Sequence, residues 1–177
     1  LCVDLLVPNN QMVYRIFLIY RPPVSCISRQ HTVSPSESMN ALVKCLEAKI
    51  SKVGPTIITG DLNCPDINWN NLSCSNEKCQ KTFYDFTNFN GFSQCVTKPT
   101  RGVNTLDLVL TNDAFVVSSI NLSPPFSISD HDKVEFDLLC PQPPSIDTVL
   151  TKRKRYLWKH GDYNGMRAFV SNYDWNS

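Results

Sequence analysis

The chain has 177 residues, 42% of them hydrophobic, which is enough for one domain with a buried core. Its formal net charge of +1 excludes a strong overall electrostatic preference for nucleic acids or membranes. No segment has the roughly 20 apolar residues that a membrane span needs, and the first residues lack the pattern of a secretory signal.

Segments typical of strands and helices alternate along the first part of the chain. Residues 12–20 (MVYRIFLIY) are an apolar run of strand length, which stops at an Arg-Pro-Pro sequence. A helix is predicted to begin after Ser34, because Pro35 follows this cap and Glu37 lies three residues beyond it. Its apolar residues recur at helical spacing (Met39, Leu42, Val43, Leu46 and Ile50). Residues 56–59 then form a short predicted strand.

The following elements continue this alternation. Residues 76–89 are predicted to form a second helix that ends at an Asn-Gly pair. Strands are predicted at residues 105–110 (TLDLVL) and 118–122. Residues 134–138 (VEFDL) alternate between apolar and acidic side chains, which is typical of a strand with one solvated face. We therefore expect a layered α/β fold without internal repeats.

The composition changes near residue 140. Residues 141–150 (PQPPSIDTVL) are rich in proline, and a basic run follows, made of Lys152, Arg153, Lys154 and Arg155. A short amphipathic helix with Tyr163, Met166 and Phe169 comes next. We expect the globular domain to end near residue 140. The basic run fits contact with phosphates, and it fits a solvated linker or a localisation signal equally well.

The eight cysteines stand at irregular spacings, and several fall in apolar stretches. A zinc site would need short paired spacings, and only Cys74 and Cys79 come close to that. We therefore expect a reduced intracellular protein with neither a disulfide framework nor structural zinc.

Three polar clusters lie at strand ends or just beyond them. Asp61 and Asn63 share a face if the backbone is extended, and their oxygens suit a hard cation such as Mg²⁺. Asp107 lies on the strand face opposite three leucines, where a buried carboxylate needs a partner. His131, next to Asp130, is the best candidate for that partner, because a carboxylate orients an imidazole and stabilises its charged form.

Each cluster alone also fits a purely structural role. Asp61 and Asn63 could form an ordinary turn after a strand, and Ser129, Asp130 and His131 could form another. Asp107 could be a hydrogen-bonded structural acid. The combination of all three in this order favours a catalytic site.

These motifs also carry a family resemblance. GDLN at 60–63, TLDLVL at 105–110 and SDH at 129–131 resemble, in this order, the C-terminal half of the endonuclease/exonuclease/phosphatase superfamily. YRPP at 20–23 resembles a loop of the same fold. The sequence PTR…NTLDLVLTN at residues 99–112 looks most like the endonuclease domain of non-LTR (LINE-type) retrotransposons. The resemblance spans nearly the whole chain.

The resemblance implies a four-layered α/β sandwich of the DNase I-like type, here incomplete because the N-terminal strands are missing. Residues 1–140 would be the C-terminal portion of that domain. Residues 141–177 would be a connector towards an absent reverse transcriptase, since the final NYDW resembles such a connector.

The resemblance also implies roles for individual residues. Asp61 would position or deprotonate the attacking water, and Asn63 would help to hold it. His131, oriented by Asp107, would contact the scissile phosphate. Asp130 would bind Mg²⁺ or Mn²⁺, although the family's Asn and Glu ligands are absent from the chain. Residues expected to contact phosphate or nucleic acid are Tyr20, Arg21, Thr100, Arg101 and the basic run 152–155.

We expect a metal-dependent endonuclease that nicks DNA and leaves a 3′-hydroxyl for reverse transcription, inactive as this fragment alone. The alternatives are an apurinic-site repair nuclease or a phosphatase of the same superfamily, and a non-catalytic remnant that only binds nucleic acid. The expected partners are DNA and a reverse transcriptase, with no membrane. The expected location is intracellular, and nuclear if the protein is functional.

Overall fold

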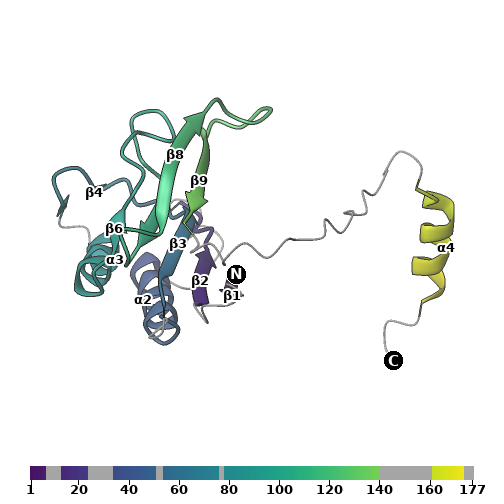
Figure 1. The fold of residues 1–177 in the computed structure, drawn as a ribbon, viewed down its shortest axis with the longest axis horizontal. Helices are drawn as coiled ribbons and strands as arrows, with labels where there is room; N and C mark the ends of the chain where they lie inside the picture. The colour runs from purple at the N-terminus through teal and green to yellow at the C-terminus, as the bar shows by residue number, and fades with distance from the viewer. Residues whose placement is uncertain (7–12, 24–33, 51–53, 76–77, 140–160, 174–177) are drawn as a thin grey trace, which may run out of the picture. The chain divides into compact units, whose positions relative to one another are not determined.

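The computed structural model describes residues 1–6, 13–23, 34–50, 54–75, 78–139 and 161–173. They belong to two compact units, Leu1–Pro143 and Pro144–Ser177. The second unit contains one described helix, α4 (Tyr163–Asn172), which Figure 1 shows in yellow. None of the side chains of this helix is buried. No helix in the described ranges is long and apolar enough to cross a membrane.

The first unit is built on a five-stranded sheet with the order β1-β2-β3-β7-β6. β2 and β3 are parallel, and every other neighbouring pair is antiparallel. The strands are β1 (Cys2–Leu6), β2 (Val13–Leu18), β3 (Thr56–Asp61), β6 (Ser93–Gln94) and β7 (Asp107–Thr111). A small separate hairpin, β4 (Ile67–Asn68) with β5 (Ser73–Cys74), follows β3 along the chain.

Two helices, α2 (Pro35–Glu47) and α3 (Lys78–Phe89), cover one face of this sheet (Figure 1). The predicted start of the first helix is confirmed, because the Ser34 hydroxyl accepts from the Glu37 N–H and the Glu37 carboxylate accepts from the Ser34 N–H. The apolar sides of the helices pack on alternate residues of β3 and β7 in one core, which includes Met39, Leu46, Phe83, Phe86, Ile58, Leu108 and Leu110.

The opposite face of the sheet is covered by an antiparallel hairpin, β8 (Val117–Ser123) with β9 (Lys133–Leu138). The predicted alternation in β9 is confirmed: Val134, Phe136 and Leu138 pack inwards, and the residues between them are exposed. Tyr14 of β2 contributes to this second core and donates from its hydroxyl to the carbonyl of Leu139 (3.0 Å). The described residues of the first unit thus form three layers: helices, the main sheet and a two-stranded sheet.

Gly60, near the end of β3, lies where the backbones of two strands come very close. Its φ of +125° is open only to glycine, and a Cβ at this position would lie 2.0 Å from the carbonyl oxygen of Ile19. The glycine therefore allows the chain after β2 to stay beside β3 as far as Asp61.

Replacing this glycine tests how tightly the two segments are held. We expect Gly60→Ala to lower the free energy of unfolding by at least about 3 kcal/mol, because backbone strain and a backbone clash add together. Gly91→Ala is the matched control: its φ is also positive (+68°), but no atom lies within 4 Å of the added Cβ. The control should cost only about 1 kcal/mol. Urea unfolding of both variants measures the difference, and equal losses would contradict this view of Gly60.

Candidate active site

Two aspartates face each other where β3 ends and β7 begins. The antiparallel register pairs Asp61 with Asp107, so both side chains lie on the same face of the sheet. That face is the one covered further along by the β8–β9 hairpin, because Ile57 and Val109 alternate with the same period and pack in the second core.

His131 joins this pair from the loop before β9. Its Nδ1 lies 2.8 Å from Oδ2 of Asp107, and the two side chains are only 22% and 21% exposed. A carboxylate at this distance holds the proton on Nδ1 and leaves Nε2 turned away from the strand. The Nε2 atom lies 4.0 Å from a carboxylate oxygen of Asp130.

The pKa of Asp61 is raised above its ordinary value of 3.8. Burial is the main cause and the charge of Asp107 adds to it, while His131 and the hydrogen bond from Asn63 act in the opposite direction. A carboxylate with a raised pKa is a better proton acceptor than an exposed one, so Asp61 has the chemistry of a general base.

The backbone at Asn63 is not extended, although the prediction that Asn63 and Asp61 share a face assumed an extended backbone. Its φ is +49°, in the left-handed region, and its backbone N–H donates to Oδ1 of Asp61 (3.2 Å). Asp61 and Asn63 therefore form the turn that the sequence allowed, and this turn lies at the candidate active site. The side-chain amide of Asn63 is buried and donates to the carbonyl of Arg21 (2.8 Å), so it holds the neighbouring loop against the end of β3.

Tyr20 and Arg21 follow β2 and lie on opposite faces. The Arg21 N–H donates to the Asp61 carbonyl (2.8 Å), which extends the pairing of β2 with β3 and puts Tyr20 beside Asp61. Because side chains alternate, Tyr20 is on the same face as Asp61, and it is 72% exposed. It is therefore within reach of a ligand that lies over the aspartates.

Arg21 does not lie where the sequence led us to expect it. Its side chain is buried on the helix side, where the guanidinium donates to the Asn63 carbonyl (3.4 Å) and to the thiol of Cys79 (3.1 Å). A buried guanidinium stabilises the turn from inside and is not presented to a nucleic acid. The expectation that Arg21 contacts nucleic acid is therefore corrected.

Thr100 is likewise buried, which corrects its expected contact with nucleic acid. Its hydroxyl accepts from the backbone N–H groups of Leu106 and Asp107 (3.1 Å each), and its carbonyl accepts from the N–H of Asp132 (2.8 Å). Thr100 thus connects the start of β7 to the loop that carries His131. A threonine between a proline and an arginine gives no sequence pattern from which this positioning role follows.

Arg101 and Asp130, expected at the nucleic acid and at the metal respectively, bind each other. The arginine Nε and Nη2 donate to the same oxygen of Asp130, at 2.7 and 2.6 Å. This hydrogen bonding lowers the pKa of Asp130 below its ordinary value. The pair is exposed at the edge of the site.

The residues at this site do not by themselves fit a complete metal centre. Within the described ranges no three His, Cys, Asp or Glu side chains come close enough to hold a metal ion. Magnesium prefers about six oxygen ligands, and one oxygen of Asp130 is already bound by Arg101. The basic run 152–155, together with His31 and His160, lies outside the described residues.

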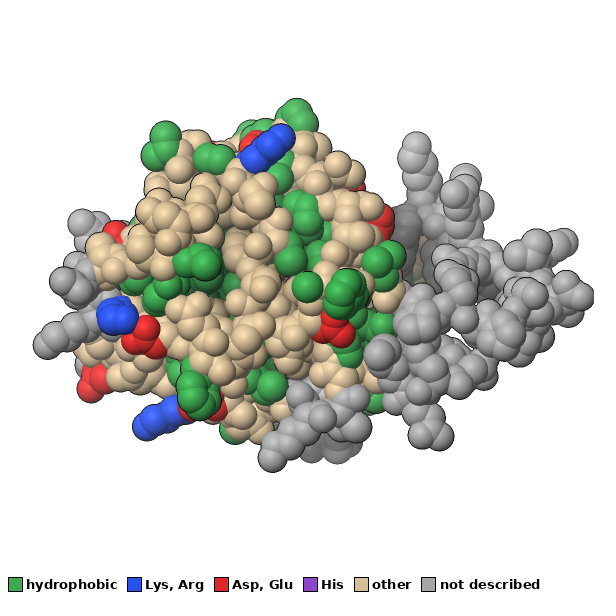
Figure 2. Space-filling view, turned by 60° about the vertical axis from the view of Figure 1, so that its left-hand side comes forward, with side chains coloured by type: hydrophobic (Ala, Val, Ile, Leu, Met, Phe, Trp, Pro, Cys, Tyr) green, Lys and Arg blue, Asp and Glu red, His purple; other side chains and the backbone are tan. Residues whose placement is uncertain are grey.

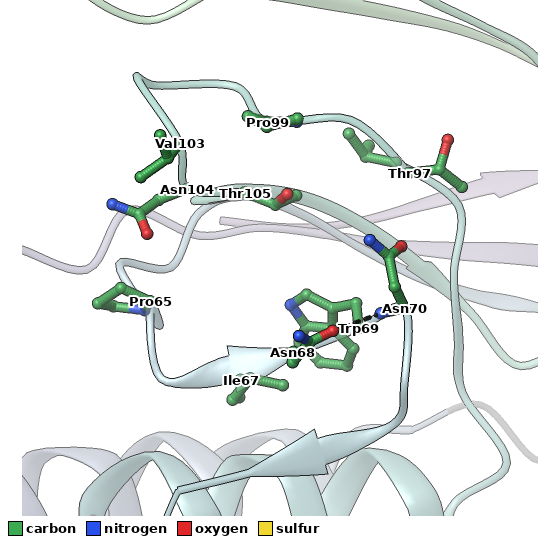
Figure 3. Close-up of a pocket in the computed structure, with 11 residues that line it drawn as sticks. Pro65, Ile67, Asn68, Trp69, Asn70, Thr97, Pro99, Val103, Asn104 and Thr105 are labelled. Atoms are coloured by element: carbon green, nitrogen blue, oxygen red, sulfur yellow. Dashed lines mark hydrogen bonds between the residues drawn. The ribbon is translucent and has the colours of Figure 1, made fainter.

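A cavity of about 270 Å³ lies close to the site, between residues 65–70 and the loop 96–105 (Figure 3). The residues that line it carry no charge, and Trp69 and Asn104 are among them. The indole N–H of Trp69 is buried and makes no hydrogen bond within the described part of the chain. A second pocket shares Pro65 and Asn104 with this cavity and reaches Asn63, and the catalytic aspartates are not among the residues that line either pocket.

Most of the chain matches a known family. Residues 14–135, which are 122 of the 177 residues, match the family described as endonuclease-reverse transcriptase. The chain belongs to this family. It therefore contains a LINE-like endonuclease domain of the endonuclease/exonuclease/phosphatase type, as the sequence motifs predicted. The match includes Tyr20, Asp61, Asn63, Asp107 and His131. No curated protein matches the chain in sequence.

The raised pKa of Asp61 predicts how stability depends on pH. The folded protein binds this proton more tightly than the unfolded chain, so this contribution is full below pH 3.8 and is lost as the pH rises through the raised pKa. We expect Asp61→Asn to unfold at higher urea than the parent near neutral pH, with the gain vanishing towards pH 3.8. Asp137→Asn, on the exposed side of β9, is the control. A gain that is independent of pH would contradict the assignment.

Proposed function

We propose that this chain carries the phosphodiesterase centre of a divalent-metal-dependent endonuclease that nicks DNA for a non-LTR retrotransposon. The observation that carries the proposal is the position of Asp61, Asp107 and His131 on one sheet face, with His131 held by Asp107 at 2.8 Å. The family match supports a nuclease in general.

Each side chain then has a defined task. Asp61 accepts a proton from the water whose oxygen attacks phosphorus, and its raised pKa suits that task. The bond between phosphorus and the 3′ oxygen breaks, and the leaving oxygen takes a proton from solvent, which gives a 3′-hydroxyl and a 5′-phosphate. Asp107 stabilises the imidazolium form of His131, whose Nε2–H donates to a phosphate oxygen. The Tyr20 hydroxyl donates to another phosphate oxygen.

The proposal includes Mg²⁺ or Mn²⁺, for which Asp130 is the ligand that this chain offers. A bound divalent cation would neutralise charge on the phosphate. Asp130 would hold the cation together with water, and in this structure it is paired with Arg101. Water would supply further ligands. Because no group of three potential metal ligands lies within the described ranges, we propose that the 177-residue chain is inactive by itself.

The wider proposal concerns the fold, the partners and the location. The three described layers would be part of a four-layered DNase I-like sandwich, to which residues 1–140 contribute the C-terminal portion. Residues 141–177 would connect it to a reverse transcriptase, and the protein would act on DNA in the nucleus. On the face seen in Figure 2, Lys and Arg side chains are few and form no continuous basic patch, so affinity for phosphates on that face would come from single side chains.

A second candidate function is binding of nucleic acid without cleavage. Two observations favour it: Arg101 is bound to Asp130, and the described ranges contain no group of three potential metal ligands. A cleavage assay separates the two functions.

We expect His131→Ala to lower the rate at which supercoiled plasmid is nicked with Mg²⁺ by at least about 100-fold, because the phosphate loses its cationic donor. Asp107→Asn should lower it by about tenfold or more, since the imidazole loses its orientation. The assay uses the chain itself and the chain extended by its native upstream sequence.

Asp137→Asn is the control for general damage, because this carboxylate lies on the outer side of β9, away from the site. It should nick as fast as the parent. If the extended parent fails to nick, or if His131→Ala nicks at the parental rate, the endonuclease proposal is wrong.

A further inference from the structure

The loop between β8 and β9 exposes two large apolar side chains. It comprises residues 124–132, and Phe126 and Ile128 within it are 82% and 100% exposed. The loop has a defined conformation, because the Ser129 N–H donates to the Phe126 carbonyl (3.2 Å) and Ser127 lies in the left-handed region (φ 58°). Figure 1 shows it projecting beyond the ends of both strands.

This loop runs directly into the candidate active site. Its last residues are Asp130, His131 and Asp132, and the ion pair with Arg101 and the hydrogen bond from Asp132 to Thr100 fix them to the neighbouring loop. Phe126 and Ile128 therefore belong to the same loop as His131 and precede it by five and three residues along the chain.

The neighbouring loop also presents an apolar side chain. Val103, between Arg101 and Asn104, is exposed at its tip. Two loops that are bonded to each other, and one of which carries His131, thus both expose apolar side chains. A single exposed apolar residue needs no explanation, but a group at the margin of a site indicates a contact surface.

The composition of the loop between β8 and β9 indicates which kind of surface it can bind. Residues 124–129 (PPFSIS) have no charged side chain, so they are unsuited to bind phosphate. The base steps and sugar faces of a nucleic acid groove are apolar, and side chains such as Phe and Ile insert there in other proteins. A duplex whose phosphate lies at His131 would place such a groove next to this loop.

We propose that Phe126 and Ile128 form an apolar wedge that inserts between base steps of DNA beside the phosphate held at His131. The inference rests on the proposed function and adds to it a residue pair that recognises and deforms the substrate. The free energy needed to unstack DNA is lowest at pyrimidine–purine steps, so we expect the protein to prefer DNA with such steps beside the bound phosphate.

The structure provides a closely matched control for this proposal. Phe115 is 85% exposed but precedes the other end of β8, whose seven residues span roughly 23 Å. The substitutions Phe126→Ser, Ile128→Ser and Phe115→Ser all change exposed side chains, so we expect each variant to fold.

The test measures binding of a short fluorescein-labelled duplex by fluorescence anisotropy. We expect the double variant Phe126→Ser, Ile128→Ser to raise Kd by about tenfold or more, as loss of two buried apolar side chains predicts. Phe115→Ser should change Kd by less than about twofold. A duplex with 2-aminopurine at a pyrimidine–purine step should gain fluorescence with the parent protein and not with the double variant.

Unchanged affinity in the double variant, or equal losses in the double variant and Phe115→Ser, would overturn the wedge. Loss of self-association instead of DNA binding, measured by sedimentation, would assign the loop to a second copy of the chain and also overturn it. If the parent nicks DNA and the double variant binds normally, the wedge fails while the endonuclease proposal stands. If the double variant loses DNA binding but His131→Ala still nicks, the endonuclease proposal fails and the wedge stands.

Discussion

The antiparallel pairing of β3 with β7 is the constraint on which the candidate site depends. It sets Asp61 opposite Asp107, and the repulsion between two carboxylates on one face then has to be compensated. His131 provides that compensation through its contact with Asp107, while burial keeps the pKa of Asp61 raised. The cores on both faces of the sheet hold the register, so the chemistry of the site depends on apolar packing around it.

Local sequence patterns predicted the parts of this structure that depend on local chemistry. The capping box at Ser34 marks where a helix begins, since its two hydrogen bonds join residues three apart. The single acid in TLDLVL indicated that Asp107 needs a partner, and the structure puts His131 next to it. The side-chain period of two in VEFDL indicated a strand that packs on one face only, as β9 does.

Other features depend on contacts between distant segments, which single-sequence patterns do not encode. Arg21 reads as an exposed cation, yet the path of the chain after β2 turns it into the helix side of the sheet. Asn63 leaves the extended conformation, and its side-chain amide donates to the Arg21 carbonyl, 42 residues away in the chain. The pairing of Arg101 with Asp130 spans 29 residues and follows from the hydrogen bonds that join the two loops. The order of the motifs therefore predicted that Asp107 and His131 lie together, but it did not predict the contacts of Arg21, Asn63 and Arg101.

The orientation of the His131 imidazole tests the central claim most directly. Nitrogen-15 NMR of the ring, at a pH where the imidazole is neutral, reports which nitrogen carries the proton. If Asp107 holds the ring as the 2.8 Å contact indicates, the proton is on Nδ1 and Nε2 is bare, and Asp107→Asn abolishes this preference. A proton mainly on Nε2, or a mixture of tautomers that Asp107→Asn leaves unchanged, would contradict the proposed centre.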